Sequence, residues 1–393
     1  MRIAVTGASG FIGSYLVPQL KDRHDLVLLG RNPDHLSKKF PGFETAAYSH
    51  LIDTLCGVDT IVHLAAILPD AKLSQDSFET ANVTLTDAIA DAGIHNGIKR
   101  FIFTTTLGWH DNAYSRTKKN AELLLKEKHS LEVTVLRLPN VYGDEFRGKL
   151  AKLNQFPPLV QRIVFPILAS LRPTVHADRV CQEIEAAILS EEPSDQFISD
   201  KQINNPVYSF VKRIIDLGFA IGVIVFLWWV ILLIYAAVRI TSPGPGIFAQ
   251  KRVGQDGTEF TLYKFRTMFL ETKSAATHEI GSSQVTAFGK ILRKFKLDEL
   301  PQIWNILRNE ISLVGPRPCL PSQTVLIEER ESRHVLQAKP GITGLAQIND
   351  IDMSDPVRLA KKDAEYLSLR TLLLDIKIIL ATALGKGAND RVS

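Results

Sequence analysis

The sequence predicts an α/β chain in two parts: a doubly wound parallel sheet, followed by a membrane-anchored, mainly helical α+β part. The first part is indicated by short apolar runs that alternate with amphipathic segments, and by a glycine-rich turn directly after the first run. The second is indicated by an uncharged run of 22 residues at 217–238, which is long enough to cross a bilayer. A chain of 393 residues has room for two domains.

The composition excludes some classes of function. The 46 basic and 42 acidic residues nearly balance and are dispersed, so nucleic acid is not an expected partner. The three cysteines, Cys56, Cys181 and Cys319, lie far apart without zinc or redox spacing, which indicates a reducing, cytosol-facing environment. The chain enters a strand at once, leaving no room for a signal peptide.

A dinucleotide site is predicted at the first turn of the sheet. Strands are expected near residues 3–6, 26–29, 60–64, 101–105 and 133–138. After the first of them, three glycines allow a tight turn into a helix, whose backbone N–H groups and dipole can bind a pyrophosphate. The residues expected to bind the cofactor here are Gly7, Gly10, Phe11, Ile12 and Gly13.

The residue after the second strand favours one of the two nicotinamide cofactors. Sheets that bind NAD usually carry an acid at this point, whereas this chain has Arg31. A guanidinium suits a 2′-phosphate, so NADP(H) is predicted. NAD stays open, since Arg31 could instead pair with Asp34 or point into solvent.

Tyr114 and Lys118 lie one helical turn apart and are expected on one face of a helix. The lysine can lower the pKa of the phenol and hold the cofactor's ribose. The tyrosine can then exchange a proton with the substrate while hydride moves to or from the nicotinamide. Thr106, at the end of the predicted fifth strand, can hydrogen-bond the same substrate oxygen.

Together with residues 104–106, 136–143 and 175–178, these motifs make residues 1–200 resemble the extended short-chain dehydrogenases that act on nucleotide sugars. The segment 144–174 is short for that family, which implies a trimmed sugar pocket. Three activities stay open: reduction of a 4-keto nucleotide sugar with NADPH, 4-epimerisation, or cofactor binding without turnover as a scaffold or sensor. The small pocket and the preference for NADP favour the reductase.

The boundary between the parts is expected at a polar linker, 201–211, which leads into a membrane-embedded helix, 212–240, and a second domain, 241–393. Lys212 and Arg213 precede the apolar run, and Arg239, Lys251 and Arg252 follow it. Because basic residues flank both ends, the positive-inside rule does not choose a direction for the helix.

Five blocks in the second half resemble the bacterial sugar transferases, the monotopic polyprenyl-phosphate phosphoglycosyl transferases. The resemblance starts near Val207 and reaches the end of the chain, with the blocks in the family's order. They lie at residues 212–216, 263–268, 297–302, 312–318 and 339–345.

The resemblance implies a chemistry for each block. Asp298 attacks the sugar-proximal phosphorus of a UDP-sugar and releases UMP, and polyprenyl phosphate then attacks the phosphosugar held on the carboxylate. Glu299 acts as a base or orients the metal, and Asp298 also neighbours Mg²⁺. Arg317 presents a fork suited to phosphate, with Lys264 and Arg293 as further phosphate contacts.

The resemblance also implies a location. Related transferases use a re-entrant helix bent at a Ser-Pro pair, and a re-entrant path is expected here too. A spanning helix stays open, because this chain has Trp228-Trp229 at that place. Since nucleotide sugars and NADPH are cytosolic, both domains are expected on the cytoplasmic side of the bacterial inner membrane. The expected partners are a UDP-sugar, polyprenyl phosphate and the bilayer, in one bifunctional enzyme; the sugar and the oligomeric state stay open, with a homodimer among the options.

Overall fold

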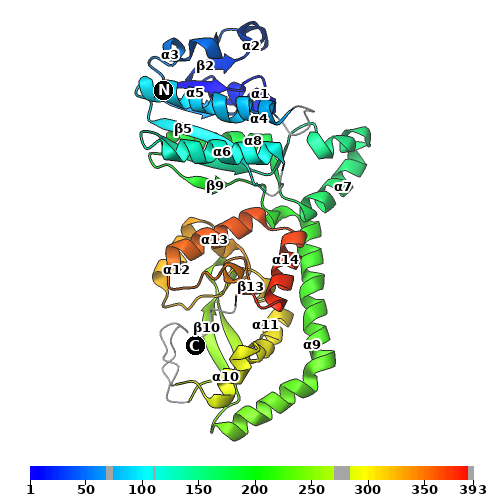
Figure 1. Ribbon diagram of the computed structural model, residues 1–393. Helices are drawn as coiled ribbons and strands as arrows, with labels where there is room; N and C mark the ends of the chain where they lie inside the picture. The colour runs from blue at the N-terminus through cyan, green and yellow to red at the C-terminus, as the bar shows by residue number, and fades with distance from the viewer. Residues whose placement is uncertain (68–73, 109–111, 270–283, 388–393) are drawn as a thin grey trace. The chain divides into compact units, whose positions relative to one another are not determined.

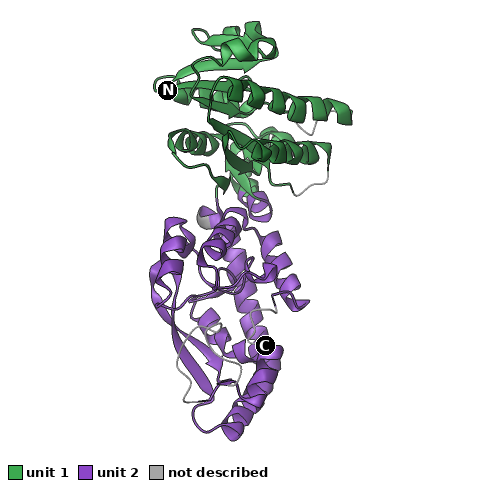
Figure 2. Cartoon of the chain, turned by 60° about the vertical axis from the view of Figure 1, so that its left-hand side comes forward, with its two compact units in different colours: residues 1–165, 173–200 green, residues 166–172, 201–393 purple. Residues whose placement is uncertain are grey.

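The computed structural model describes residues 1–67, 74–108, 112–269 and 284–387. The chain forms two compact units, the first made of residues 1–165 and 173–200, the second of 166–172 and 201–393 (Figure 2). It therefore passes between the units three times. Each unit has its own hydrophobic core.

Unit 1 is built on a seven-stranded sheet in which all neighbouring strands run parallel, in the order β3-β2-β1-β4-β5-β6-β9. This confirms the predicted doubly wound parallel sheet. The strands are β1 (Arg2–Thr6), β2 (Asp25–Gly30), β3 (Glu44–Ala47), β4 (Thr60–His63), β5 (Arg100–Thr106), β6 (Glu132–Leu138) and β9 (Asp195–Phe197).

Helices cover both faces of this sheet (Figure 1). Successive side chains of a strand point to opposite faces, and in β1 Ile3 and Val5 join the core with α1 (Phe11–Leu20) and α8 (Ala177–Leu189). Ala4 joins the other core, with α5 (Leu85–His95) and α6 (Ala113–Glu127). The remaining elements of the first 200 residues are α2 (Pro33–Lys39), η1 (Tyr48–His50), α3 (Leu51–Thr54), α4 (Gln75–Glu79), η2 (Thr80–Thr84), β7 (Asn140–Tyr142), η3 (Gly148–Gln155), α7 (Pro158–Leu171) and β8 (Thr174–His176).

Unit 2 is mainly helical, with an antiparallel pair of strands, β10 and β11, and a short parallel pair, β12 and β13. This is the α+β organisation predicted for the second part. Its elements are η4 (Gln202–Asn204), α9 (Pro206–Thr241), β10 (Ile247–Val253), η5 (Gln255–Gly257), β11 (Glu259–Phe265), α10 (Ala287–Lys294), η8 (Leu297–Gln302), α11 (Ile303–Leu307), β12 (Ser312–Val314), α12 (Thr324–Ser332), η9 (Val335–Gln337), β13 (Gly341–Thr343), η10 (Gln347–Asn349), α13 (Pro356–Leu369) and α14 (Leu372–Ala383).

Helix α9 begins at Pro206, six residues before the predicted start at position 212. The reason is local: the Asn205 side chain accepts hydrogen bonds from the N–H groups of Val207 and Tyr208, at 3.1 and 3.3 Å. Proline at the first helical position has no N–H to leave unpaired. The second half of the predicted linker is therefore the first turns of α9.

The apolar part of α9 is largely exposed. Its most apolar stretch has a mean hydropathy of 2.8, yet only 17% of it is buried. Among the described residues, α9 is the one helix long and apolar enough to cross a membrane. It bends along its length (Figures 1 and 2), and its exposed side chains include Phe226, Trp228, Trp229 and Leu233. A soluble core helix would bury these side chains, so the exposure is compatible with membrane anchoring.

Candidate functional site

The two predicted carboxylates of unit 2 lie on a short helical turn. Lys296 takes a left-handed backbone conformation, with φ of 57°, directly before η8. Asp298 and Glu299 then occupy the first turn of η8, which continues directly into α11. Asp298 is buried, and the Glu299 side chain is 16% exposed. The acidic pair is therefore held largely out of water.

The two carboxylates have pKa values displaced in opposite directions. Burial alone would raise the pKa of Glu299, but the charges of Lys264 and Arg317 outweigh burial and lower it to about 2. The Lys264 Nζ on β11 lies 2.7 Å from the Glu299 Oε1. Burial and the neighbouring Glu299 charge raise the pKa of Asp298, against the opposing charges of Lys264 and Arg293. Glu299 is thus a fixed anion, and Asp298 is the more basic carboxylate.

Arg293, at the end of α10, approaches the same pair. Its Nε donates to the Thr267 Oγ1 at 3.0 Å, and its charge opposes the rise in the pKa of Asp298. The Arg293 Nη1 is buried and has no hydrogen-bond partner within the described part of the chain. A buried donor without an acceptor is costly, and a phosphate oxygen would satisfy it.

Arg317 reaches the site from the loop after β12. Its carbonyl oxygen accepts a hydrogen bond from the Arg330 Nη1 at 2.9 Å. Arg330 in turn pairs with Asp363 at 2.7 Å, with both side chains only 3% exposed. A Cβ on Gly315 would lie 2.4 Å from the Lys339 carbonyl oxygen, so glycine is needed where these two segments meet. The loop is therefore fixed from both sides.

The structure thus brings together five of the residues predicted for unit 2: Asp298, Glu299, Lys264, Arg293 and Arg317. The described residues contain no group of three His, Cys, Asp or Glu side chains that could hold a metal ion. A single carboxylate at this site nevertheless fits Mg²⁺, which usually binds one or two protein carboxylates and completes its shell with water and substrate phosphates. Asp298 is the carboxylate available to bind this metal, because Glu299 is paired with Lys264.

The glycine turn of unit 1 has the geometry of a dinucleotide cradle. Gly7 has φ of +72°, and a Cβ there would lie 2.7 Å from the Ala65 nitrogen. A Cβ on Gly13 would lie 2.5 Å from the Ala8 carbonyl oxygen, so only glycine lets α1 pack this closely. Gly10 caps α1 without a side-chain hydrogen bond. The N–H groups that open α1, at Phe11 and Ile12, can therefore face an anion.

Arg31 is exposed directly after β2. A residue not predicted from sequence, Tyr48, lies close to it. Burial dominates the pKa of the Tyr48 hydroxyl and raises it to about 12, while a hydrogen bond from the Gly7 amide and the charge of Arg31 oppose the rise. No motif points to Tyr48, which lies in a short turn after the edge strand β3.

Tyr114 and Lys118 lie one turn apart on α6, which Asn112 caps through the Ser115 N–H at 2.8 Å. Lys118 is 2% exposed, and its Nζ lies 4.2 Å from the centre of the Phe103 ring. Burial lowers the pKa of Lys118 to about 7 and raises the pKa of Tyr114 to about 12. The lowering of the phenol's pKa expected from the lysine is therefore not present in this structure.

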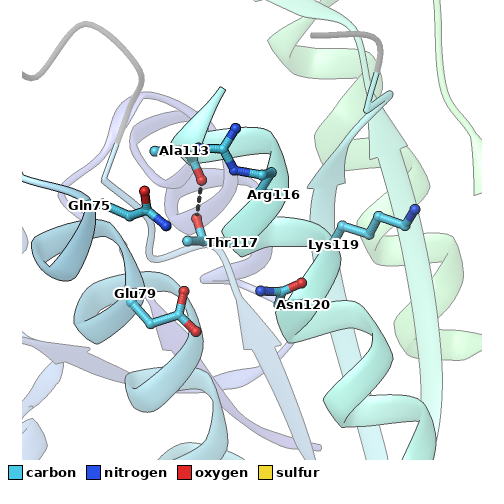
Figure 3. A pocket seen from close by; sticks show the side chains of 7 residues that line it. All are labelled: Gln75, Glu79, Ala113, Arg116, Thr117, Lys119 and Asn120. Carbon is cyan, nitrogen blue, oxygen red and sulfur yellow. Dashed lines mark hydrogen bonds between the residues drawn. The ribbon is translucent and has the colours of Figure 1, made fainter. Parts of the chain in front are cut away.

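Thr106 is the last residue of β5 and is half-buried. A cavity of about 170 Å³ opens elsewhere, between α4 and α6 (Figure 3). Its lining consists of Gln75, Glu79, Ala113, Arg116, Thr117, Lys119 and Asn120. Neither Thr106 nor the Tyr114–Lys118 pair contributes to the lining, so this cavity is not the predicted site.

The two halves of the chain match two protein families. Residues 207–386 match the family described as bacterial sugar transferase. Residues 3–178 match the family described as NAD dependent epimerase/dehydratase.

Curated relatives match the second half. The sequence is 39% identical over 172 residues to the "Uncharacterized sugar transferase EpsL" of Bacillus subtilis, a match that covers 44% of this chain and 85% of that protein. It is 39% identical over 184 residues to a UDP-glucose:undecaprenyl-phosphate glucose-1-phosphate transferase of Xanthomonas campestris, covering 44% of this chain and 38% of that protein. It is 34% identical over 190 residues to a UDP-N-acetylgalactosamine-undecaprenyl-phosphate N-acetylgalactosaminephosphotransferase of Aeromonas hydrophila, covering 45% of this chain and 44% of that protein. The chain thus spans less than half the length of the last two relatives.

Solved structures match the first half. The crystal structure of UDP-N-acetylglucosamine 4-epimerase from Bacillus cereus is 21% identical, with a TM-score of 0.41, covering 51% of this chain and 75% of that chain.

Proposed function

Because this chain belongs to the bacterial sugar transferase family, we propose that its second half transfers a phosphosugar from a UDP-sugar to polyprenyl phosphate. One observation carries the proposal. A basic Asp298 and an ionised Glu299 lie side by side among three cationic side chains. Such a group suits a nucleophile that must attack an anionic phosphorus.

The reaction proceeds in two displacements. In the first, an Asp298 oxygen bonds to the sugar-proximal phosphorus, the bond between that phosphorus and the bridging oxygen breaks, and UMP leaves with the electron pair. In the second, a phosphate oxygen of the polyprenyl phosphate bonds to the same phosphorus, and the bond to Asp298 breaks. The products are a polyprenyl diphosphate sugar and the regenerated carboxylate.

The cations of the site bind and orient the two phosphates. The Arg293 Nη1, which has no hydrogen-bond partner in the described part of the chain, and the guanidinium of Arg317 bind phosphoryl oxygens. The planar guanidinium suits this role because it can donate two parallel hydrogen bonds to a phosphate. Lys264 holds Glu299 ionised and in place, so that Glu299 can orient the metal that Asp298 would bind. With a pKa of about 2, Glu299 is too weakly basic to act as the base. Mg²⁺ held at Asp298 would neutralise charge on the phosphoryl oxygens.

Helix α9 supports placement at a membrane. Its exposed apolar surface suits hydrocarbon, and a lipid-linked acceptor requires a site at the bilayer surface. We place both units on the cytoplasmic side of the bacterial inner membrane, because UDP-sugars and NADPH are cytosolic. A re-entrant path for α9 satisfies this requirement and has support from its bend (Figure 1).

For the first half we propose reduction of a 4-keto nucleotide sugar with NADPH. The exposed Arg31 beside the glycine turn supports NADP(H), and Tyr114 and Lys118 are present on one helix face. Thr106 would hydrogen-bond the substrate carbonyl. A 4-epimerase and a non-catalytic dinucleotide-binding scaffold are the two competing functions. Tyr114→Phe separates the scaffold from both enzymes. It should abolish sugar conversion by a reductase or an epimerase, because there the tyrosine exchanges a proton, and it should leave the output of a scaffold unchanged.

The transferase proposal is tested with detergent-solubilised protein, Mg²⁺, polyprenyl phosphate and a panel of UDP-sugars, with UMP release as the readout. We expect release by the wild type and none by Asp298→Asn, which keeps the shape of the side chain but is not a nucleophile. Release that persists in Asp298→Asn would refute the role of Asp298. Absence of release with every stable donor, and also after NADPH and a 4-keto nucleotide sugar are added, would refute the proposed transfer.

A further inference from the structure

The basic pair at the start of α9, Lys212 and Arg213, lies where charges are usually interpreted as membrane flanks. In this protein both charged groups donate hydrogen bonds to other residues of unit 2. The Arg213 Nη1 and Nη2 donate to the carbonyl oxygens of Ile306 and Leu307, at 2.7 and 3.1 Å. The last carbonyls of a helix have no partner within the helix, so Arg213 caps the end of α11. Because α11 continues η8 directly, this contact fixes the segment that carries Asp298 and Glu299.

Lys212 fixes a different segment of the site. Its Nζ donates to the Val314 carbonyl oxygen at 2.9 Å and to the Asp375 Oδ2 at 2.8 Å. Val314 ends β12, three residues before Arg317. The Asp375 carboxylate also accepts hydrogen bonds from Tyr208 at 2.9 Å and from Tyr366 at 2.7 Å. The ammonium group is thus bound in a buried network rather than left for lipid headgroups.

Asp216, one helical turn after Lys212, holds the start of the same strand. Its Oδ1 accepts from the Leu313 N–H at 2.9 Å and from the Ser312 Oγ at 3.0 Å. Three side chains from adjacent turns of α9 therefore bind both segments that present the charged groups of the site. A displacement of α9 moves the acidic pair and the phosphate-binding arginine together.

We propose that Lys212 and Arg213 are positioning residues of the transferase site, which attach α11 and β12 to the membrane helix, and are not charges that set its orientation. The inference rests on the proposed phosphosugar transfer. A misplacement of about 1 Å can reduce the rate of a positioned reaction about a hundredfold. Two attachments to one helix hold the nucleophile and the phosphate-binding loop in register.

Arg213→Lys is the decisive variant. It keeps the positive charge, and hence any effect on orientation, but it loses the planar fork that reaches two carbonyls at once. We expect kcat for UMP release to fall about tenfold or more, with unchanged protease accessibility of both units in membrane vesicles. Arg239→Lys is the matched control, because Arg239 is an exposed arginine on the same helix, and it should keep the wild-type kcat.

Hydrogen exchange provides a readout that does not depend on activity. Amides of residues 303–310 should exchange faster in Arg213→Lys than in the wild type or in Arg239→Lys, while the sheet of unit 1 is unchanged. Wild-type kcat together with wild-type exchange in Arg213→Lys would overturn the inference, even though the transfer itself is established. If the wild type releases no UMP, the proposed function fails separately, and the exchange data alone decide whether Arg213 attaches α11.

A milder variant guards against a general loss of folding. Ser312→Ala removes one of the two hydrogen bonds that β12 donates to Asp216 and leaves the Leu313 N–H in place. We expect a fall in kcat of about threefold with a thermal midpoint close to that of the wild type. An unchanged kcat in Ser312→Ala and in Arg213→Lys, with both proteins folded, would leave α9 without a positioning role.

Discussion

Replacing Lys264 by methionine tests the electrostatics of the acidic pair. Lys264 and Glu299 form an ion pair of 2.7 Å, with side chains 20% and 16% exposed, so water screens it little. The variant keeps the apolar stem but removes the charge. With the lysine gone, burial is opposed mainly by Arg317, and the pKa of Glu299 must rise from about 2.

The magnitude follows from the pKa of Glu299, which is about 2 in the folded protein against an ordinary value of 4.5. At roughly 1.4 kcal/mol per pKa unit, this corresponds to about 3 kcal/mol of stability at pH 7. The contribution of a carboxylate whose pKa is lowered is present above its unfolded value, and it is lost as the pH falls through the folded value. It therefore falls to about 1 kcal/mol at pH 3 and close to zero below pH 2.

The assay is urea unfolding of the wild type and Lys264→Met between pH 3 and pH 8, in detergent. We expect Lys264→Met to be destabilised by about 2–3 kcal/mol at pH 7 and by much less at pH 3. Lys251→Met, at an exposed lysine on the neighbouring strand β10, is the matched control and should cost less than about 0.5 kcal/mol. A destabilisation of Lys264→Met that is equal at both pH values would refute the assignment of this energy to Glu299.

The same variant should change the pH dependence of the rate. Lys264 also opposes the rise in the pKa of Asp298, so its removal raises that pKa further. The acidic limb of the profile of kcat/KM for UMP release should move to higher pH, because more Asp298 is protonated at a given pH. An acidic limb that stays in place would mean that Asp298 does not have to be ionised for the rate-limiting step.

Three further predictions concern unit 1. Gly13→Ala should abolish dinucleotide binding, measured by cofactor fluorescence, because its Cβ would lie 2.5 Å from the Ala8 carbonyl oxygen; wild-type binding would exclude a closely packed turn. Arg31→Ala should weaken NADPH binding about tenfold relative to NADH in parallel titrations, since one charge-assisted phosphate contact is lost; an unchanged ratio would remove Arg31 from cofactor choice. Lys118→Met should raise the thermal midpoint more at pH 6 than at pH 9. The reason is that burial lowers the pKa of Lys118 to about 7, so the full cost of the buried ammonium to stability is present only below that pH. An equal gain at both pH values would contradict this cause.

The strands that were predicted are those whose sequence carries a strong apolar signal. These strands, β1, β2, β4, β5 and β6, are buried on both faces, and their sequences are apolar runs. The two edge strands, β3 and β9, were not predicted. Their sequences, ETAA and DQF, are short and largely polar, because an edge strand packs on few neighbours. Nothing local distinguishes such segments from loops.

For the candidate sites, sequence blocks identified the charged residues but not their states. The opposite pKa changes of Asp298 and Glu299 depend on Lys264, which precedes the pair by more than 30 positions and reaches it only through the fold of β11 onto η8. Lys212 and Arg213 look like membrane flanks in sequence, since a pattern cannot show that carbonyls of Ile306 and Val314 lie within reach. Tyr48 has no motif at all.

The three passages of the chain between its units make the protein poorly divisible. Residues 166–172 belong to the second unit although they precede the last strand of the first. Gln202 donates to the Ala169 carbonyl oxygen at 2.6 Å, and Asn205, which caps α9, donates to that of Pro166 at 2.9 Å. A truncated chain that starts at residue 201 would leave both donors without these acceptors. A gene rearrangement that exchanges the first half must therefore carry this seven-residue segment across with the transferase, or replace it.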